Sequence, residues 1–110
     1  MKIWVDDVRP APEGYQQCKS VASAKCFIRW CEKVMKEDEE LGFSSSYYKI
    51  ELIDIDHDAG EYVKLGGNYI KLLEWLEETG RSYPIHIHSD NQINLLWMRE
   101  IIERNGWKEV

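Results

Sequence analysis

Apolar and polar positions along the chain alternate between short apolar runs and longer amphipathic stretches. Four segments have the length and apolar character of strands: 2–6, 15–19, 50–55 and 84–88. Three stretches carry apolar residues at three- and four-residue spacing and predict helices with one buried face: 20–35, 69–76 and 93–103. Trp107 to Val110 follows Asn105-Gly106 and is expected to form a final edge strand.

The order of these segments predicts a parallel sheet. Strands that alternate with helices pair in parallel through right-handed crossovers. One connection differs, because Pro10, Pro12 and Gly14 make residues 8–14 a loop where a helix would otherwise stand. The loops after Asp6, Ile55 and His88 all follow strand ends and should meet at one edge of the sheet.

Composition limits the class of protein. A chain of 110 residues with 44% hydrophobic residues is expected to form a single domain over 1–110 with one core. The net charge of −6 disfavours general binding to nucleic-acid backbones. Three cysteines without a CxxC pair fit a reducing compartment, and no apolar run reaches the roughly 18 residues of a membrane span, so we expect a cytoplasmic protein that binds no membrane. The oligomeric state is open.

Two of the predicted strands end in pairs of acids, Asp6-Asp7 and Asp56-x-Asp58. Neighbouring carboxylates repel each other, and a hard divalent cation relieves that repulsion by taking oxygen ligands. We therefore expect Asp6, Asp7, Asp56 and Asp58 to bind a divalent cation, Mg²⁺ in the first place and Mn²⁺ as the alternative. The simpler explanation is that Asp and Gly only form turns after strands. Asp54 lies deeper on the face of Asp56, as a partner of a ligand or a structural residue.

The histidines lie close to the same strand ends. His57 and His88 are candidates for acid–base catalysis, because an imidazole titrates near neutral pH and can protonate a leaving oxygen. His86 lies deeper in its strand and is expected to be structural. Imidazoles also suit a transition metal, which is an alternative for the three histidines together.

Polar side chains near these strand ends suit a phosphate. Ser89 and Asn91 precede a predicted helix, whose amino end attracts anions, although they also suit an ordinary helix cap. Arg9 follows the first acid pair and either binds a phosphate in bidentate fashion or neutralises Asp6 or Asp7.

Several motifs resemble a known family. Three segments in order resemble response-regulator receiver domains: Ile3-Trp4-Val5-Asp6-Asp7, Leu52-Ile53-Asp54-Ile55-Asp56 and Ile85-His86-Ile87-His88-Ser89. Three more closely resemble the divergent cyclic-phosphate processing receiver-like family: Val5-Asp6-Asp7-Val8-Arg9-Pro10, Ile55-Asp56-His57-Asp58-Ala59-Gly60 and Ile87-His88-Ser89-Asp90-Asn91.

The resemblance implies a flavodoxin-like, three-layer α/β sandwich around a parallel five-stranded sheet of order 2-1-3-4-5, with the first crossover helix lost. It implies that Asp6 and Asp7 are the acidic metal pair, that Asp56 stands at the phosphoacceptor position and that Ser89 supplies the receiver's hydroxyl. Receivers also end their fifth strand with a lysine, and this chain reaches Val110 without one.

Two functions are therefore expected. The first is a metal-dependent phosphoesterase, a hydrolase or phosphotransferase that processes cyclic phosphates of nucleotides or nucleic-acid ends. In it Asp56, His57 and His88 are catalytic, and Arg9, Ser89 and Asn91 bind the phosphate. The alternative is a non-enzymatic receiver-like signalling or interaction module with Asp56 as phosphoacceptor. A haloacid-dehalogenase-type phosphatase is disfavoured, because its Asp-x-Asp motif should follow the first strand.

Overall fold

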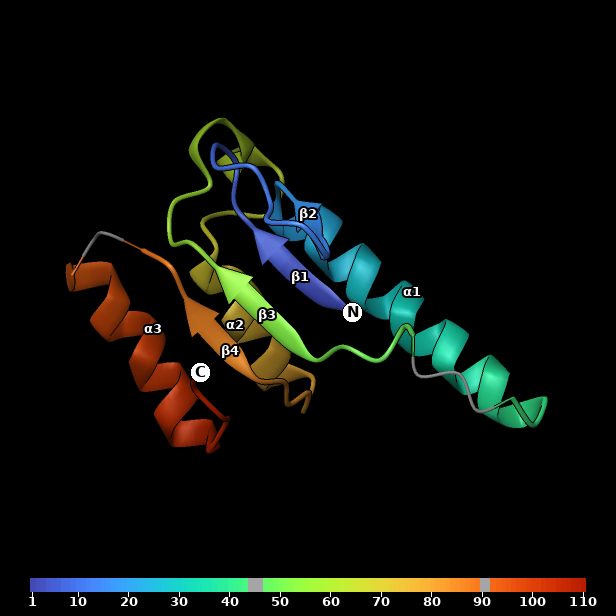
Figure 1. The fold of residues 1–110 in the computed structure, drawn as a ribbon. Coiled ribbons are helices and arrows are strands. Elements are labelled where there is room, and N and C mark those ends of the chain that lie inside the picture. The colour runs from blue at the N-terminus through green and yellow to red at the C-terminus, as the bar shows by residue number, and fades with distance from the viewer. Residues whose placement is uncertain (44–46, 90–91) are drawn as a thin grey trace.

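The computed structural model describes residues 1–43, 47–89 and 92–110 (Figure 1). The elements in chain order are β1 (Lys2–Val5), β2 (Tyr15–Cys18), α1 (Val21–Glu40), β3 (Leu52–Ile55), the 3₁₀ helix η1 (Gly60–Lys64), α2 (Ile70–Glu78), β4 (Ile85–Ile87) and α3 (Gln92–Asn105). The first four predicted strands and all three predicted helices are present. Residues 8–14 form a loop, as their prolines predicted.

The sheet has four strands in the order β2-β1-β3-β4, and every pair is parallel. The predicted fifth strand is reduced to one parallel bridge between Ile85 and Glu109. Ile85 N–H donates to Lys108 O at 2.9 Å, and Val110 N–H donates to Ile85 O at 2.8 Å. The carboxyl-terminal segment therefore lies beside β4 where the order 2-1-3-4-5 places it, but it is too short to count as a strand.

The three helices form one layer. Helix α2 packs against both α1 and α3, and it lies behind the sheet in Figure 1. The strands bury an aliphatic row against this layer: Ile3, Val5, Ile53, Ile55, Ile85 and Ile87. Among the described residues the expected three layers are thus two. The physical reason is the direction of the crossovers: only the step from β1 to β2 runs backwards across the sheet, and a loop makes that step.

Helix α1 begins where the sequence predicted. Ser20 caps it through a reciprocal pair of bonds with Ser23, in which each side chain accepts from the other residue's backbone N–H. The helix continues through the charged run to Glu40 and buries Val21, Ala24, Ile28 and Cys31.

Backbone bonds continue one residue beyond the strands and align the loops that follow them. Asp6 N–H donates to Cys18 O at 3.3 Å, Asp56 N–H to Val5 O at 2.9 Å and His88 N–H to Ile55 O at 3.0 Å. Asp6, Asp56 and His88 therefore lie side by side at the carboxyl edge of the sheet, where their sequence positions predicted them.

Candidate functional site

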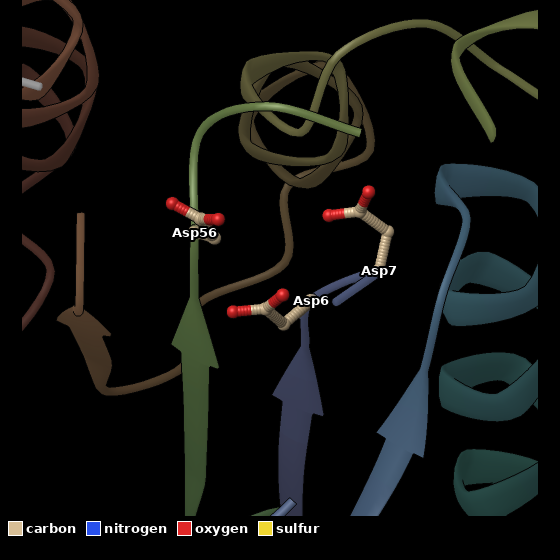
Figure 2. Close-up of side chains that lie close together, drawn as sticks. All are labelled: Asp6, Asp7 and Asp56. Carbon is tan, nitrogen blue, oxygen red and sulfur yellow. The ribbon is translucent and has the colours of Figure 1, made fainter. Parts of the chain in front are cut away.

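Three carboxylates meet at this edge. One oxygen from each of Asp6, Asp7 and Asp56 lies within 4.8 Å of the other two, and we call these residues the carboxylate cluster (Figure 2). They come from the ends of β1 and β3, as the sequence predicted. Asp58, the fourth predicted ligand, is outside this group, and its Oδ1 accepts the Gly60 N–H at 2.9 Å.

Asp6 is the most firmly held member of the cluster and is fully buried. Its Oδ1 accepts the backbone N–H groups of Val8 and Arg9, both at 2.9 Å, and its Oδ2 lies 2.9 Å from His88 Nε2. Burial alone would raise the pKa of Asp6, but the bonds from Arg9, Val8 and His88 outweigh it and hold the pKa below its usual value. Asp6 is therefore ionised and already partly neutralised by the protein.

Asp7 has the opposite balance. Burial raises its pKa, its own backbone N–H opposes this, and the charges of Asp6, Asp58 and Asp56 raise the pKa further. Gly60 packs directly on its carboxylate, since a Cβ atom at Gly60 would lie 2.3 Å from Asp7 Oδ2. Asp7 is thus the carboxylate whose charge the protein compensates least.

Asp56 and His57 follow β3 directly and contact each other. Asp56 Oδ1 accepts the His57 N–H at 2.8 Å. His57 Nδ1 lies 2.7 Å from Ser89 Oγ and 3.6 Å from Asp56 Oδ1. A bond at Nδ1 sets the orientation of an imidazole ring and leaves Nε2 as the atom available to a ligand.

His88 occupies a closed environment. Its Nδ1 lies 2.6 Å from Asp54 Oδ1 and its Nε2 lies 2.9 Å from Asp6 Oδ2. Trp4 stacks on the ring with centroids 3.8 Å apart, and His86 Nδ1 lies 2.9 Å from the same Asp54 oxygen. Burial alone would lower the pKa of His88, but Asp54 and Asp6 raise it above its usual value. When both nitrogens donate to carboxylates, the ring carries a positive charge.

The loop after β1 brings Arg9 to the same edge. Arg9 Nη1 donates to His88 O at 3.0 Å, and Arg9 O accepts from Trp4 Nε1 at 3.0 Å. The guanidinium is thus tied to the loop after β4 by a backbone carbonyl. Asn91, predicted to bind phosphate, lies outside the described residues, and so does its neighbour Asp90.

A pocket of about 490 Å³ opens over these groups. Its lining residues are Asp6, Asp7, Val8, Arg9, Asp56, His57 and Asp58. Six of these seven were predicted site residues. Ser89 and His88 are not among them, since each lies one contact further back, behind His57 and Asp6 respectively.

The donors of the carboxylate cluster fit a hard cation. The cluster offers only carboxylate oxygens, which are the ligands that Mg²⁺ and Mn²⁺ prefer, and the repulsion that raises the pKa of Asp7 is what a divalent cation relieves. The histidine rings have other partners: His57 Nδ1 contacts Ser89 Oγ, His86 contacts Asp54, and His88 contacts Asp54 and approaches the cluster only as a partner of Asp6.

A second cavity lies at the amino ends of the strands. It has a volume of about 960 Å³, and Met35, Tyr48 and Pro84 are among its lining residues. It is larger and more apolar than the acidic pocket, but none of the predicted site residues lines it. Size alone therefore does not locate the chemistry of this protein.

Two features of the site were not predicted from the sequence. Trp4 was interpreted only as an apolar strand residue, yet it covers His88. Gly60 was interpreted as an ordinary turn residue, yet it makes room for Asp7. The register of the sheet places Trp4 beside Asp54 and Asp54 beside His86, and the sequence alone does not record this pairing.

Comparison with known proteins identifies a family. The family model described as "Cyclic-phosphate processing Receiver domain" matches residues 1–104. Neither the curated proteins nor the solved structures give a match. Within the described part of the chain, no helix has the length and apolar character needed to cross a membrane.

Proposed function

Because this chain belongs to the cyclic-phosphate processing receiver domain family, we propose that it is a divalent-cation-dependent phosphoesterase that opens cyclic phosphates of nucleotides or nucleic-acid ends. The observation that carries the proposal is the lining of a single pocket by three clustered carboxylates, a guanidinium and an imidazole. Those are the groups that binding and cleaving a phosphodiester require: sites for cation and phosphate, and a proton donor.

The carboxylate cluster holds the cation in this proposal, with Mg²⁺ preferred and Mn²⁺ as the alternative. Asp58 lines the same pocket, and its negative charge adds to the attraction of the pocket for a cation. The bound cation supplies neutralisation of the charge on the phosphoryl oxygens. Arg9, on the same loop after β1 as Asp7, binds a phosphate oxygen, and its bond to His88 O restricts where the guanidinium can lie.

His57 is the proton donor. It lines the pocket, whereas His88 has carboxylates at both ring nitrogens. Ser89 holds the His57 ring through Nδ1, so that Nε2 is the atom that gives a proton to the leaving hydroxyl. Of the two histidines expected in catalysis, His57 is therefore assigned this role.

Asp56 is either the nucleophile or the general base. As the nucleophile it attacks the phosphorus itself, and as the general base it takes a proton from the attacking water. In both cases one phosphorus–oxygen bond of the ring breaks and the released oxygen takes the proton from His57. If Asp56 is the nucleophile, water then breaks the bond between Asp56 and phosphorus and regenerates the carboxylate, so one water is consumed overall by either route. The product is an acyclic phosphomonoester.

Turnover measurements test the proposal. The purified protein is incubated with Mg²⁺ or Mn²⁺ and a panel of 2′,3′-cyclic nucleotides, 3′,5′-cyclic nucleotides and RNA ends with a terminal cyclic phosphate, and products are followed by ³¹P NMR. We expect turnover that chelation abolishes and that Asp56→Asn and His57→Gln reduce by about 10²-fold or more. Glu40→Gln, a loss of one carboxylate at the far end of α1, is the matched control and should keep full activity.

A second experiment on the same purified protein distinguishes the alternative function from the enzyme. A receiver-like module with Asp56 as phosphoacceptor would take a phosphoryl group from a small phosphodonor and show a stable mass increase that maps to Asp56. Such an adduct, together with no turnover on any cyclic phosphate, would replace the enzyme by the signalling module. Turnover without a stable adduct supports the enzyme.

A further inference from the structure

Four side chains form a continuous hydrogen-bonded chain across the ends of β1, β3 and β4. His86 Nδ1 and His88 Nδ1 both contact Asp54 Oδ1, at 2.9 and 2.6 Å, and His88 Nε2 contacts Asp6 Oδ2 at 2.9 Å. The sheet register causes this, because Asp54 pairs directly with His86 on β4 and with Trp4 on β1. The chain connects a side chain at the free face of the sheet to a member of the carboxylate cluster.

The His88 ring has little freedom within this chain. Trp4 stacks on it with an interplanar angle of 4°, and Trp4 is itself held by the bond from Nε1 to Arg9 O. The side chains of His88 and Asp54 are only 10% and 8% exposed. Since both ring nitrogens are engaged, rotation of the ring would break two charge-assisted hydrogen bonds at once.

Asp6 is fixed from the other side as well. Its Oδ1 accepts two backbone N–H groups, which occupies both lone pairs of that oxygen, and Oδ2 accepts from His88. Only one lone pair of Oδ2 remains for a further ligand. The plane of this carboxylate, and therefore the direction in which it offers that lone pair, depends on His88.

We propose that His88 and Asp54 are positioning residues for the cation site: Asp54 holds His88, and His88 orients the Asp6 carboxylate toward the space between Asp7 and Asp56. This inference rests on the proposed binding of a divalent cation by the carboxylate cluster. Partners that lie behind metal ligands typically contribute 10- to 100-fold to affinity.

His86 provides a matched control on the same strand. It contacts the same oxygen of Asp54, but its side chain is 42% exposed and bonds Asp54, not Asp6. Replacing His86 removes an imidazole and a bond to Asp54 while leaving the contact between His88 and Asp6 in place. A difference between the two histidine variants therefore reports the contacts that His88 makes and His86 does not, with Asp6 Oδ2 and with the Trp4 ring.

The experiment measures Mn²⁺ affinity by electron paramagnetic resonance for the wild type and for His88→Gln, Asp54→Asn and His86→Gln. We expect affinity 10- to 100-fold weaker for His88→Gln and Asp54→Asn and within about 3-fold of the wild type for His86→Gln. Without a positioning role, His88→Gln should bind Mn²⁺ as tightly as the wild type or more tightly, because losing the His88 contact frees a second lone pair of Asp6 Oδ2 for the cation. Weaker binding is thus specific to positioning.

A double variant tests whether Asp54 acts on the cation site through His88. Because Asp54 acts on the cation only through His88, the variant with both substitutions should bind Mn²⁺ no more weakly than His88→Gln alone, whereas independent effects would multiply. Circular dichroism of each variant establishes that it is folded, and Asp54→Asn carries the test if His88→Gln is not.

The possible outcomes are distinct. A wild type that binds no Mn²⁺ overturns both this inference and the proposed function. A wild type that binds Mn²⁺, with His88→Gln and Asp54→Asn equal to it or tighter, overturns only the positioning role. Multiplicative losses in the double variant also overturn it, because they would mean that Asp54 acts by a separate route.

Discussion

Replacing Asp7 by Asn should stabilise the cation-free protein, although it removes a predicted ligand. Asp7 is the carboxylate whose pKa is raised, by burial and by the charges of Asp6, Asp58 and Asp56. A carboxyl group whose pKa is raised by folding destabilises the fold when ionised, so Asp7 costs stability at neutral pH. Asparagine has nearly the same shape and removes that charge.

The size of the effect follows from the separation of the carboxylates. Two unit charges 4.8 Å apart, the largest spacing in the carboxylate cluster, repel by about 0.9 kcal/mol in water and by about 3.5 kcal/mol at an effective dielectric constant near 20. Asp7 is partly exposed, and one neighbour, Asp6, is compensated by backbone N–H groups and His88. The lower end applies, and a gain of about 1 kcal/mol raises the melting temperature of a domain of this size by about 4 °C.

The assay is thermal and denaturant unfolding in EDTA at pH 7, repeated with increasing Mg²⁺. In EDTA, Asp7→Asn should unfold at a higher temperature than the wild type. Added Mg²⁺ should close this gap, because the wild type binds Mg²⁺ more tightly and gains about 2.7 kcal/mol when the Mg²⁺ concentration is 100 times its dissociation constant. The gap should also close as the pH falls toward the ordinary range of Asp, because the wild-type carboxyl then takes up its proton.

The neighbouring acid supplies the opposite control. Asp6→Asn should destabilise the protein by roughly 1–3 kcal/mol, since it removes the charged acceptor of His88 in a fully buried place. If Asp7→Asn is no more stable than the wild type in EDTA, or if both variants change stability in the same direction, the assignment of uncompensated charge to Asp7 is refuted.

Two further predictions concern the surroundings of the cluster. Gly60→Ala should destabilise the protein by more than about 1 kcal/mol and weaken Mg²⁺ binding, because the φ of Gly60 is +54° and the new Cβ would meet Asp7 Oδ2. Gly80→Ala is the control: its φ is +69° and the space around it is open, so it should cost stability without changing Mg²⁺ affinity. Unfolding measures the stability, and calorimetric titration measures the Mg²⁺ affinity. The pKa of His88 is raised by its bonds to Asp54 and Asp6, so these bonds stabilise the fold fully below the usual pKa of about 6.5 and are lost as the pH rises through the higher folded value. In EDTA the wild type should therefore lose stability as the pH rises above about 6.5, and His88→Gln should not lose it; parallel curves of stability against pH would contradict this.

Local signals in the sequence were sufficient for most of the fold. The apolar spacing from Val21 onward predicted α1, and the prolines of 8–14 predicted a loop instead of the first crossover helix. The fifth strand was not predictable in the same way, because Trp107 is buried in the core while Glu109 makes only one bridge to β4. Strand length at a sheet edge depends on pairing with a neighbour, and no local pattern records it.

The sequence predicted most of the residues that form the site, but not the residues that contact them. Asp6, Asp7 and Asp56 could be grouped from the sequence because parallel strands place their ends together. His88 could not be separated from His57 as an acid, since the difference lies in what touches each ring: Asp54 and Asp6 for one, Ser89 for the other. Such contacts depend on register between strands more than 30 residues apart.

The alternation of side chains along the strands nevertheless separates the residues at this edge into two sets. Residues at even positions of β1, β3 and β4 point to the face that carries no helix within the described residues, and the bonded chain of Asp6, His88, Asp54 and His86 is drawn only from them. Residues at odd positions of these strands face the helices, and the pair of His57 and Ser89 has odd positions in the loops that follow β3 and β4. The carboxylate cluster is where the two sets meet, since Asp6 and Asp56 come from one and Asp7 from the other. A substitution of Asp54 or His88 should therefore act on the cation site through Asp6, and a substitution of Ser89 should act on the proton donor His57.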